Sequence, residues 1–504
     1  MLKKVLIANR GEIALRIVRA CHELGIQAVA VYSEADRLAP HVLYADQAFP
    51  IGPAPSAQSY LRPEVLIATA KQAGCDAIHP GYGFLSERAS FAESVTQAGL
   101  VFVGPTASAI AAMGDKTQAR RRMVAAGVPV VPGTSEVIRD VEAARTQAEA
   151  LGWPVLLKAS AGGGGKGMRV VRSPEDLQRA FEAATHEAGS AFGDPSMYLE
   201  KYLEGPRHIE VQILADQHGT ILHLGERECS IQRRHQKLIE ESPSPALTAE
   251  LRERMGAAAV AAARAVAYTN AGTIEFLFQD GQFFFLEMNT RIQVEHPVTE
   301  LVTGIDLVQW QLHIASGDAL PFKQTDVQWH GHAIECRITS EDPRENFLPS
   351  TGRIDLLTLP AGAGVRWDGG IETGSEVSLY YDPMLAKLIV HASTRAAAIA
   401  RMQRALAELV VVGVETSASL HRRVLQEPDF VAGRLTIDYL DQHPELLRST
   451  RPASGLELAA VVAALLEEEK STRRSAPRIA RSSGSRAGGH TDPPSSDWRG
   501  RRSW

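Results

Sequence analysis

The chain has 504 residues, of which 44% are hydrophobic and 22% charged, and its 59 acidic residues exceed its 53 lysines and arginines, giving a formal charge of −6. This balance argues against a nucleic-acid partner, because phosphate binding leaves a net basic footprint. The length predicts three or so packed units, at about 100–200 residues per domain. The sequence lacks the roughly 20 consecutive apolar residues of a membrane span, and charge interrupts its start too early for a signal peptide. We therefore expect a cytoplasmic protein with no membrane contact.

The first part of the chain alternates strand and helix patterns. Val5–Ala8 is a short apolar run typical of a buried strand, the apolar spacing after Gly11 predicts a helix, and Ala28–Tyr32 predicts another strand. Further strand-like runs follow at Ala77–His79 and Leu100–Val103. This alternation predicts a doubly wound, Rossmann-like domain over residues 1–114. The first turn lacks GxGxxG spacing, so no dinucleotide site is expected there.

A glycine-rich segment follows a helix predicted at Lys116–Ala126. Pro154–Ser160 and Met168–Val171 predict two strands, joined by the sequence AGGGGKG at 161–167. A P-loop is excluded, because it needs GxxxxGK[ST] before a helix. Consecutive glycines let backbone N–H groups wrap an anion, and Lys158 and Lys166 add positive charge, which suits a triphosphate. Taken alone, the loop is equally compatible with a surface hairpin that binds no ligand.

The most specific pattern is a polar stripe on a predicted hairpin. Strand periodicity puts Glu287, Asn289 and Arg291 on one face. Glu275 on the preceding strand lies opposite Glu287 if the loop has an odd length, such as Asp280-Gly281-Gln282. Two facing carboxylates repel each other unless a cation lies between them, and their oxygens favour magnesium held together with substrate phosphates. A solvated sheet face is the alternative, but neighbouring phenylalanine runs indicate that these strands are buried.

A basic and polar cluster covers Pro206–Gln212 and Cys229–Lys237. Within it, His208 and Glu210 share one face of a predicted strand. Such a run, taken alone, is more often a solvated surface than a site.

The cysteine spacing and the end of the chain carry less information. Cys21, Cys75, Cys229 and Cys336 lie far apart without CxxC spacing, so neither a zinc knuckle nor a disulfide framework is expected. Residues 204–446 alternate strands and helices as one large mixed unit. A helix is predicted at 457–469, and the Arg-, Ser-, Gly- and Pro-rich remainder of 447–504 is expected to be disordered.

Four segments resemble signatures of the ATP-grasp enzymes and, within them, of the biotin carboxylases. They are KVLIANRGEIALRI at the start, IHPGYGFLSE at 78–87, WPVLLKASAGGGGKGM at 153–168 and FLEMNTRIQVEHPVTE at 285–300. The glycine hairpin and the Glu-x-Asn-x-Arg strand are shared with carbamoyl-phosphate synthetases, whereas the other motifs narrow the match to biotin carboxylation. The resemblance covers residues 1–446. It implies an α/β ATP-grasp fold with an N-terminal Rossmann-like domain (1–114), a linker helix and glycine-loop lid (115–203) and a large mixed C-terminal domain (204–446).

The resemblance implies the reaction as well. Bicarbonate would attack the γ-phosphate of ATP, with Mg²⁺ or Mn²⁺, to give carboxyphosphate, which yields carbon dioxide and phosphate. The phosphate would then deprotonate biotin, and the carboxylated biotin would serve an acetyl-CoA or other acyl-CoA carboxylase. The chain lacks the Ala/Val-Met-Lys-Met sequence in which carrier domains biotinylate lysine, so the biotin carboxyl carrier protein and the carboxyltransferase are expected as separate chains. Relatives also imply a homodimer.

Site roles carry over from the family by motif position. The nucleotide-binding set comprises Lys116, Lys158, Gly162, Gly163, Gly164, Gly165, Lys166, Gly167, Met168, Glu200, Lys201, Leu203, His208, Gln232, His235, Leu277 and Ile437. The metal ligands would be Glu275, Glu287 and Asn289. The bicarbonate-binding set comprises Lys237, Arg291, Gln293, Val294 and Glu295, and the biotin-facing set comprises Tyr82, Gly83 and Arg337.

Among these residues, the resemblance assigns four to the chemistry. Lys237 would meet the transferred phosphate and bicarbonate, and Arg291 would clamp the planar anion by two hydrogen bonds. Glu295 would be the general base that takes the bicarbonate proton. Arg337 would stabilise the enolate oxygen of biotin. Asp438 stands where relatives carry a histidine near the nucleotide, so it receives no role.

Two other functions are compatible with an ATP-grasp signature. A different ATP-grasp ligase, such as a carbamoyl-phosphate-forming enzyme, is disfavoured by Arg337 and by the run Gln293-Val294-Glu295. A non-enzymatic ATP-binding scaffold should have lost at least one key residue, yet all five are present: Glu275, Glu287, Arg291, Glu295 and Lys237.

The glycine run generates the first prediction. Replacing Gly162–Gly165 with alanines should slow turnover, because a lid must fold over the nucleotide to keep carboxyphosphate from water. The measurement is steady-state ATP cleavage, and full activity in the altered protein would contradict the lid.

Overall fold

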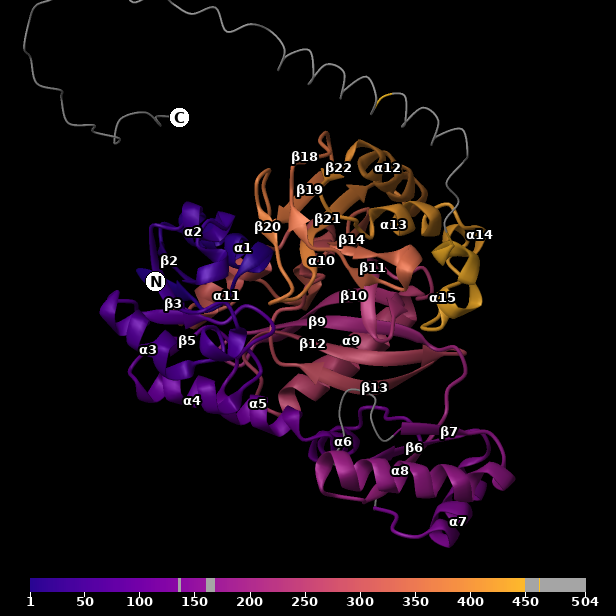
Figure 1. Cartoon of the computed structure of the whole chain (residues 1–504). Helices are drawn as coiled ribbons and strands as arrows, with labels where there is room; N and C mark the ends of the chain where they lie inside the picture. The colour runs from indigo at the N-terminus through magenta and orange to yellow at the C-terminus, as the bar shows by residue number, and fades with distance from the viewer. Residues whose placement is uncertain (135–136, 160–167, 449–461, 463–504) are drawn as a thin grey trace, which may run out of the picture. The chain divides into compact units, whose positions relative to one another are not determined.

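The computed structural model describes residues 1–134, 137–159, 168–448 and 462, and Met1–Arg448 form one compact unit (Figure 1). The predicted helix at 457–469 and the basic tail lie outside the described residues, except at position 462. The domain boundaries given above stay predictions. Within the part of the chain that is described, every helix is too short or too polar to cross a membrane.

The N-terminal part contains a parallel sheet in the order β3-β2-β1-β4-β5. Its strands are β1 (Lys4–Ile7), β2 (Gln27–Ser33), β3 (Gln47–Gly52), β4 (Ala77–His79) and β5 (Val101–Phe102). Its helices are α1 (Gly11–Glu23), η1 (Glu34–Asp36), α2 (Pro40–Tyr44), η2 (Ser56–Gln58), α3 (Pro63–Gln72), α4 (Ala89–Gln97) and α5 (Ala107–Gly114).

Helices cover both faces of this sheet. On β1, Val5 and Ile7 pack in the cluster that contains α1, whereas Leu6 packs in the cluster that contains α3 and α4. Burial on both faces explains why these strands are continuous apolar runs. The predicted doubly wound arrangement is confirmed. Strand β3 was not predicted, because Pro50 and polar residues interrupt its apolar pattern.

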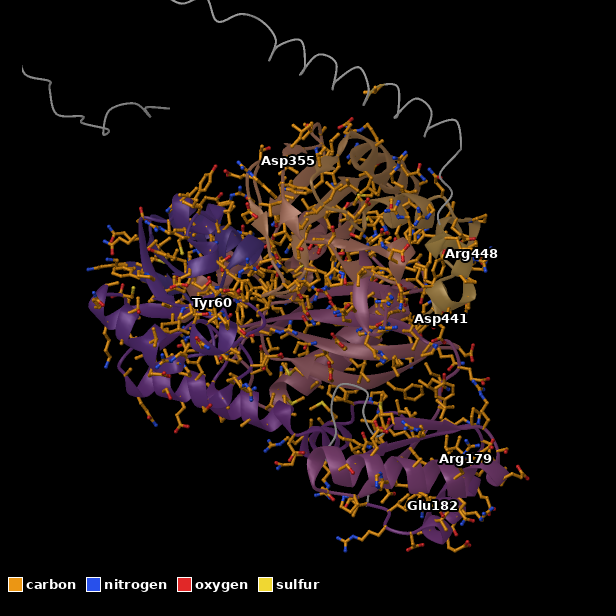
Figure 2. The ribbon with its side chains drawn as sticks, viewed as in Figure 1. Tyr60, Arg179, Glu182, Asp355, Asp441 and Arg448 are labelled. Atoms are coloured by element: carbon orange, nitrogen blue, oxygen red, sulfur yellow. The ribbon has the colours of Figure 1, made fainter. Side chains whose placement is uncertain are left out.

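A smaller antiparallel sheet, in the order β7-β6-β8, follows the linker helix. This region consists of α6 (Lys116–Ala125), α7 (Val141–Leu151), β6 (Val155–Ala159), β7 (Met168–Val171), η3 (Pro174–Asp176), α8 (Leu177–Phe192) and β8 (Met197–Lys201). Leu177 and Phe181 of α8 are buried against the sheet, whereas Arg179 and Glu182 are exposed on the opposite face of the helix (Figure 2). The predicted β6–β7 hairpin is confirmed, and its connecting glycines lie outside the described residues.

The largest sheet is antiparallel, in the order β13-β12-β9-β10-β11-β14-β21-β19. Its strands are β9 (Arg207–Ala215), β10 (Ile221–Arg233), β11 (Gln236–Ser242), β12 (Asn270–Gln279), β13 (Gln282–Asn289), β14 (His332–Thr339), β19 (Val365–Gly369) and β21 (Met384–Ala392). Short strands flank it: β15 (Glu341–Asp342), β16 (Leu348–Pro349), β17 (Gly352–Arg353), β18 (Leu356–Thr358), β20 (Glu376–Val377) and β22 (Val410–Val412).

The helices of this part are α9 (Ala249–Ala265), α10 (His296–Thr303), α11 (Leu307–Ala315), η4 (Gln324–Asp326), η5 (Pro343–Glu345), α12 (Arg395–Glu408), α13 (Ala418–Val424), α14 (Pro428–Val431), α15 (Tyr439–Gln442) and η6 (Pro444–Leu447). Several of them pack on the large sheet, among them α9, α10, α11 and α12, and the other helices lie between or after its strands in the chain. Met255, Ala259 and Ala262 of α9 pack in the same core as Ile209 and Val211 of β9. One further core joins Ile13 and Ile17 of α1 to Leu307 and Leu312 of α11.

The β12–β13 hairpin places Glu275 opposite Glu287, as predicted, but not through the predicted loop. The turn contains only Asp280 and Gly281, both with positive φ (51° and 76°), the geometry of a two-residue type I′ turn. Because this loop has two residues instead of three, Gln279 lies opposite Gln282 at the turn, which by itself would place Glu275 opposite Leu286. A bulge at Leu286, between Phe285 and Glu287, inserts one residue and restores the predicted pairing. The prediction of a three-residue loop was wrong, because a bulge cannot be recognised from the hydrophobic pattern of the strand.

The turn geometry can be tested by substitution. Replacing Gly281 with alanine should lower the free energy of unfolding by about 1 kcal/mol, because a side chain at φ +76° is strained. Asp280→Asn is the matched control and should leave stability unchanged, since Asn-Gly suits the same turn. Urea denaturation of both variants gives the measurement, and an unchanged midpoint for Gly281→Ala would contradict the assigned turn.

Candidate active site

The candidate site centres on the ammonium group of Lys237 in β11. Its Nζ lies 2.5 Å from a carboxylate oxygen of Glu210, 2.9 Å from Glu275 and 2.6 Å from Glu295. Glu210 and Glu295 are fully buried, and the Lys237 side chain is only 10% exposed. One cation thus holds together acids from β9, from β12 and from the segment before α10.

The sheet register produces this concentration of charge. Glu210 pairs with Arg227 of β10 on one side and with Glu275 of β12 on the other, and Glu275 pairs in turn with Glu287 of β13. Directly opposed residues place their side chains on the same face, and like charges there repel. The row of acids therefore needs cations, which Arg227 and Lys237 provide.

Arg227 is buried without exposed surface and has a polar partner on every side. Its Nε donates to Glu210 at 2.5 Å, one terminal nitrogen donates to Gln212 at 2.6 Å and to Thr299 at 3.0 Å, and the other donates to Thr273 at 3.0 Å. A buried guanidinium with all these bonds is a rigid part of the site.

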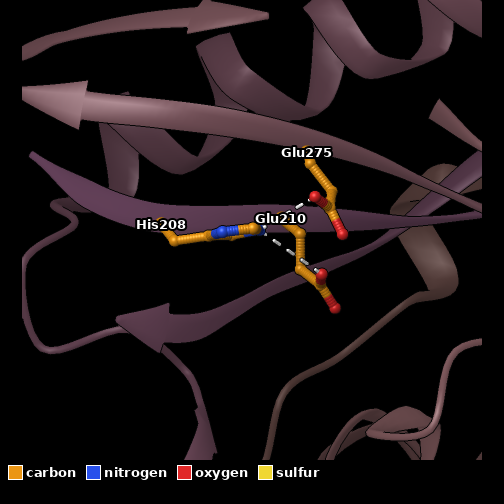
Figure 3. Close-up of side chains that lie close together, drawn as sticks. All are labelled: His208, Glu210 and Glu275. Carbon is orange, nitrogen blue, oxygen red and sulfur yellow. Dashed lines mark ion pairs between the residues drawn. The ribbon is translucent and has the colours of Figure 1, made fainter. Parts of the chain in front are cut away.

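His208 adds a nitrogen donor to two of the carboxylates (Figure 3). Its Nε2 lies 3.1 Å from Glu275 and 4.0 Å from Glu210. The donor types of these three residues are compatible with a metal ion. Both carboxylates also contact Lys237, so charge pairing between side chains holds these three residues in place.

The cations shift the ionisation of the acids. Burial alone would raise the pKa of Glu275, but Lys237 and His208 outweigh it and hold that pKa well below its ordinary value. Burial would likewise raise the pKa of Glu295, but Lys237 and Arg337 outweigh it and hold that pKa well below its usual range. Burial likewise opposes the charge of Lys237, yet its three carboxylate partners raise its pKa well above the ordinary value. Glu275, Glu295 and Lys237 are therefore charged at neutral pH, whereas burial raises the pKa of Glu210 against the opposing effect of Arg227 and Lys237.

Arg291 lies just beyond β13, which ends at Asn289, so it does not continue the strand alternation that the sequence suggested. It nevertheless stays in the same group of side chains. Its guanidinium donates to Gln293 at 2.8 Å and to Asn289 at 3.1 Å, and its Nε lies 3.3 Å from Glu87. Asn289 and Gln293 each donate to Glu275, at 2.7 and 3.0 Å.

Arg337 of β14 bridges two buried carboxylates. Its Nε donates to Glu240 at 2.6 Å, and a terminal nitrogen donates to Glu295 at 3.0 Å. Glu295 therefore contacts both Lys237 and Arg337, which joins the residues predicted for bicarbonate to the residue predicted for biotin.

A second chain of contacts connects the N-terminal part to the same place. The Tyr82 hydroxyl donates to Glu12 of α1, and Glu12 lies 3.3 Å from Nζ of the fully buried Lys387. That Nζ donates to the carbonyl oxygen of Val294 at 2.7 Å. Gly83, next to Tyr82, has φ +68° and open space where a side chain would begin.

Three of the residues predicted for the nucleotide, Lys158, Glu200 and Lys201, lie on the neighbouring strands β6 and β8. Lys158 donates to Glu200 at 2.6 Å, and Arg120 of α6 donates to the same carboxylate at 3.3 Å. Burial alone would lower the pKa of Lys158, but the neighbouring Glu200 and Tyr198 raise it above its ordinary value. Lys201 donates through its side chain to the carbonyls of Gly152 and Trp153, and its backbone N–H donates to Pro132.

Other members of the nucleotide set occupy different environments. Gln232 is buried, His235 is exposed, and Leu203, Leu277 and Ile437 are half-buried. Met168 begins β7, opposite Lys158. Gly162 to Gly167, including Lys166, and the side chain of Lys116 lie outside what the structure describes.

Several residues of the network were not assigned from the sequence. Glu210 was recognised as sharing a face with His208 but received no role, and Arg227, Glu240 and Lys387 were not singled out. The run 229–237 was compatible with a solvated surface, which is wrong for its buried residues 229–232. The available signal was the alternation of charged residues within strands that are otherwise buried, as in GERECSIQ of β10.

The strand order of the large sheet and its buried cluster of cations and acids are those of an ATP-grasp ligase. Three family models match the chain: "Biotin carboxylase, N-terminal domain" over residues 1–110, "Carbamoyl-phosphate synthase L chain, ATP binding domain" over 115–323 and "Biotin carboxylase C-terminal domain" over 335–442. The chain belongs to the biotin carboxylase family. It is 54% identical over 445 residues to biotin carboxylase 1 of Bacillus subtilis, which covers 88% of this chain and 99% of that protein.

Solved structures match the chain as well. The biotin carboxylase of Campylobacter jejuni superposes with a TM-score of 0.83 at 48% identity, over 88% of this chain and 99% of that one. The biotin carboxylase domain dimer of Hydrogenobacter thermophilus 2-oxoglutarate carboxylase, solved with MgADP, ADP and bicarbonate, has a TM-score of 0.83 at 48% identity, over 90% of this chain and 100% of that one. The predicted family, fold class, enzyme class and cofactors (ATP, magnesium and biotin) are confirmed.

The charge balance at Lys237 generates a stability prediction. Lys237→Met should lower the free energy of unfolding by about 3–5 kcal/mol at pH 8, because buried carboxylates lose their shared cation. In the wild type, the pKa values of Glu275 and Glu295 are lower in the folded than in the unfolded protein. These two acids therefore stabilise the fold at any pH above their ordinary pKa, and this stability is lost only as the pH falls toward the lower, folded-state values. Without the cation, burial raises these pKa values, so the loss should shrink from pH 8 to pH 5.

Thermal unfolding of wild type and variant across this range gives the measurement. Lys71→Met, at an exposed position on α3, controls for loss of a lysine. A loss of equal size at pH 5 and pH 8 would show that Lys237 does not neutralise these acids.

Proposed function

We propose that this chain carboxylates biotin on a separate carrier protein, from ATP and bicarbonate through carboxyphosphate, as the first half-reaction of an acyl-CoA carboxylase. The observation that carries the proposal is the contact of Glu295 with both Lys237 and Arg337, at 2.6 and 3.0 Å. Through this contact Glu295, which is suited to activate bicarbonate, directly touches Arg337, which is suited to stabilise negative charge on biotin.

The donor set at the end of the β12–β13 hairpin fits a magnesium ion. Glu275 and Glu287 are directly opposite each other, and the amide oxygen of Asn289, which accepts a hydrogen bond from Arg291 in this structure, lies two residues further on. Magnesium prefers such oxygen ligands, shared with phosphates. When bound, it would neutralise phosphate charge and polarise the γ-phosphoryl group of ATP. Lys158 and the glycine loop would hold the phosphates from the other side.

The side chains near Arg291 would handle bicarbonate. Arg291 presents a planar guanidinium that Asn289 and Gln293 hold in orientation, which suits two hydrogen bonds to a planar anion. Glu295 is ionised and can accept the bicarbonate proton as a bicarbonate oxygen attacks the γ-phosphorus and ADP leaves. Its low pKa makes it a weak base, so proton uptake would be favoured once Lys237 turns toward the phosphate.

Carboxyphosphate would then break its C–O bond to give carbon dioxide and phosphate. Phosphate would take the proton from the ureido nitrogen of biotin, and that nitrogen would form a bond to the carbon of carbon dioxide. Arg337 would stabilise the negative charge that develops on the ureido oxygen, while Tyr82 and Gly83 would face the biotin rings.

The wider setting belongs to the same proposal. The carrier and carboxyltransferase would be separate chains, the enzyme would act as a cytoplasmic homodimer, and the product would feed acyl-CoA carboxylation such as that of fatty acid synthesis. The dimeric domain of the Hydrogenobacter relative supports the homodimer. The free, buried thiols of Cys21, Cys75, Cys229 and Cys336 are compatible with a reducing compartment.

Bicarbonate-dependent ATP cleavage, measured with and without free biotin, tests the function. Biotin should stimulate the wild type. Arg337→Ala should lower the biotin-dependent rate by about 10²–10³-fold, the usual effect of losing a group that stabilises developing charge. Glu295→Gln should lower cleavage by about 10²–10⁴-fold through loss of the base. Arg179→Ala, on the exposed face of α8, should match the wild type.

Two results would overturn the assignment. If biotin does not stimulate ATP cleavage by the wild type, the result would favour another ATP-grasp ligase. Wild-type rates in Arg337→Ala or Glu295→Gln would remove the roles assigned to these side chains.

A further inference from the structure

Two buried acids behind Arg337 are not used by the mechanism described so far. Glu240 on β11 and Glu335 on β14 are directly opposite each other in the antiparallel register, and they are 1% and 0% exposed. Residues in this relation have side chains on the same face, with Cβ atoms roughly 4.5–5.5 Å apart. Two buried negative charges so close together are strongly unfavourable.

The two acids differ in their partners. One oxygen of Glu240 accepts the 2.6 Å bond from Nε of Arg337, whereas neither oxygen of Glu335 has a hydrogen-bond partner among the described protein groups. Burial raises the pKa of Glu240 to about 7, although Arg337 opposes the rise. Burial also raises the pKa of Glu335 well above its ordinary value; Lys387 opposes this rise and Glu240 adds to it.

The surroundings contain charge of both signs. The other titratable or charged groups near the pair are Cys229 on β10, Lys237 on β11, Cys336 and Arg337 on β14, Lys387 on β21 and Glu295 before α10. His421 on α13 is also close, because its ring is hydrogen-bonded to the backbone carbonyl of Arg337. Burial lowers the pKa of His421 to about 4, so it adds no charge at neutral pH. Arg337 is thus flanked by Glu295 and Glu240, with Glu335 beside them.

We propose that Glu240 and Glu335 form a carboxyl pair that retains one proton and acts as a positioning element for Arg337 in biotin carboxylation. Glu240, as the ionised member, orients the guanidinium from its Nε side. Glu335, as the protonated member, keeps the pair from adding a second negative charge. A second negative charge would neutralise the guanidinium more fully and weaken its hold on the enolate oxygen of biotin. The inference rests on the function proposed above.

The pair makes a directional prediction about pH. Activity with biotin should fall as the pH drops through the apparent pKa of the pair, because protonated Glu240 no longer orients Arg337 as an anion. Glu335→Gln mimics the protonated acid but has no proton to lose, so it prevents the second negative charge that the pair would gain at high pH. The kcat/KM of the wild type for biotin should therefore also fall at high pH, as the pair loses its retained proton, and Glu335→Gln should move this alkaline limb to higher pH by about half a unit or more.

Glu240→Gln keeps the shape but replaces a charge-assisted bond with a neutral one. Its kcat/KM for biotin should fall by about tenfold or more, and clearly more than its biotin-independent ATP cleavage falls. Glu241→Gln is the matched control. Glu241 is the next residue on β11, equally buried, and bonds to His332 and Arg395 instead of Arg337. It should lower thermal stability without changing the ratio of the two activities.

The full-length chain is used, with thermal unfolding recorded for each variant. The proposal is overturned if Glu240→Gln lowers both activities in parallel, as Glu241→Gln would through a purely structural role, or if Glu335→Gln leaves the alkaline limb unmoved. The second result decides the matter even where Glu240→Gln does not accumulate as folded protein. Failure of the proposed function is distinct, because the wild type itself would then show no stimulation by biotin.

Discussion

The structure depends on the neutralisation of a row of acids by buried cations. Glu210, Glu275 and Glu287 are brought side by side by the sheet register, and Lys237 contacts the first two of them while Arg227 contacts Glu210. A buried ion cluster seldom adds much net stability compared with apolar packing. Its value here is chemical, because it stores charge that substrates can reorganise without a large movement of the backbone.

The same cluster couples distant parts of the chain. Glu12 of the N-terminal helix reaches Lys387, which holds the Val294 carbonyl next to Glu295. Arg337 approaches Glu295 from another strand. A substrate that displaced Lys237 from Glu295 would therefore change the charge seen by Arg337. This gives a physical route by which phosphoryl transfer and biotin activation can share a single carboxylate.

Much of the fold and part of the site follow from local patterns. Apolar runs predicted four of the five strands of the N-terminal sheet, and the β6–β7 hairpin and the pairing of Glu275 with Glu287 were predicted correctly. The bulge at Leu286 was not, since an inserted residue preserves the strand's composition. Nor was Arg227 assigned a role, because a charged residue in a strand looks like a solvated one until the neighbouring strands are known.

The sequence by itself determined the family, the element types and the residue types needed for phosphate and carboxylate chemistry, because these depend on spacing along one segment. Only the tertiary structure decided which charges meet. Lys237, Glu210, Glu275 and Glu295 come from separate segments, and their contact depends on strand order and register. Their ionisation is likewise a property of shared burial and mutual distance, which no single segment of the chain encodes.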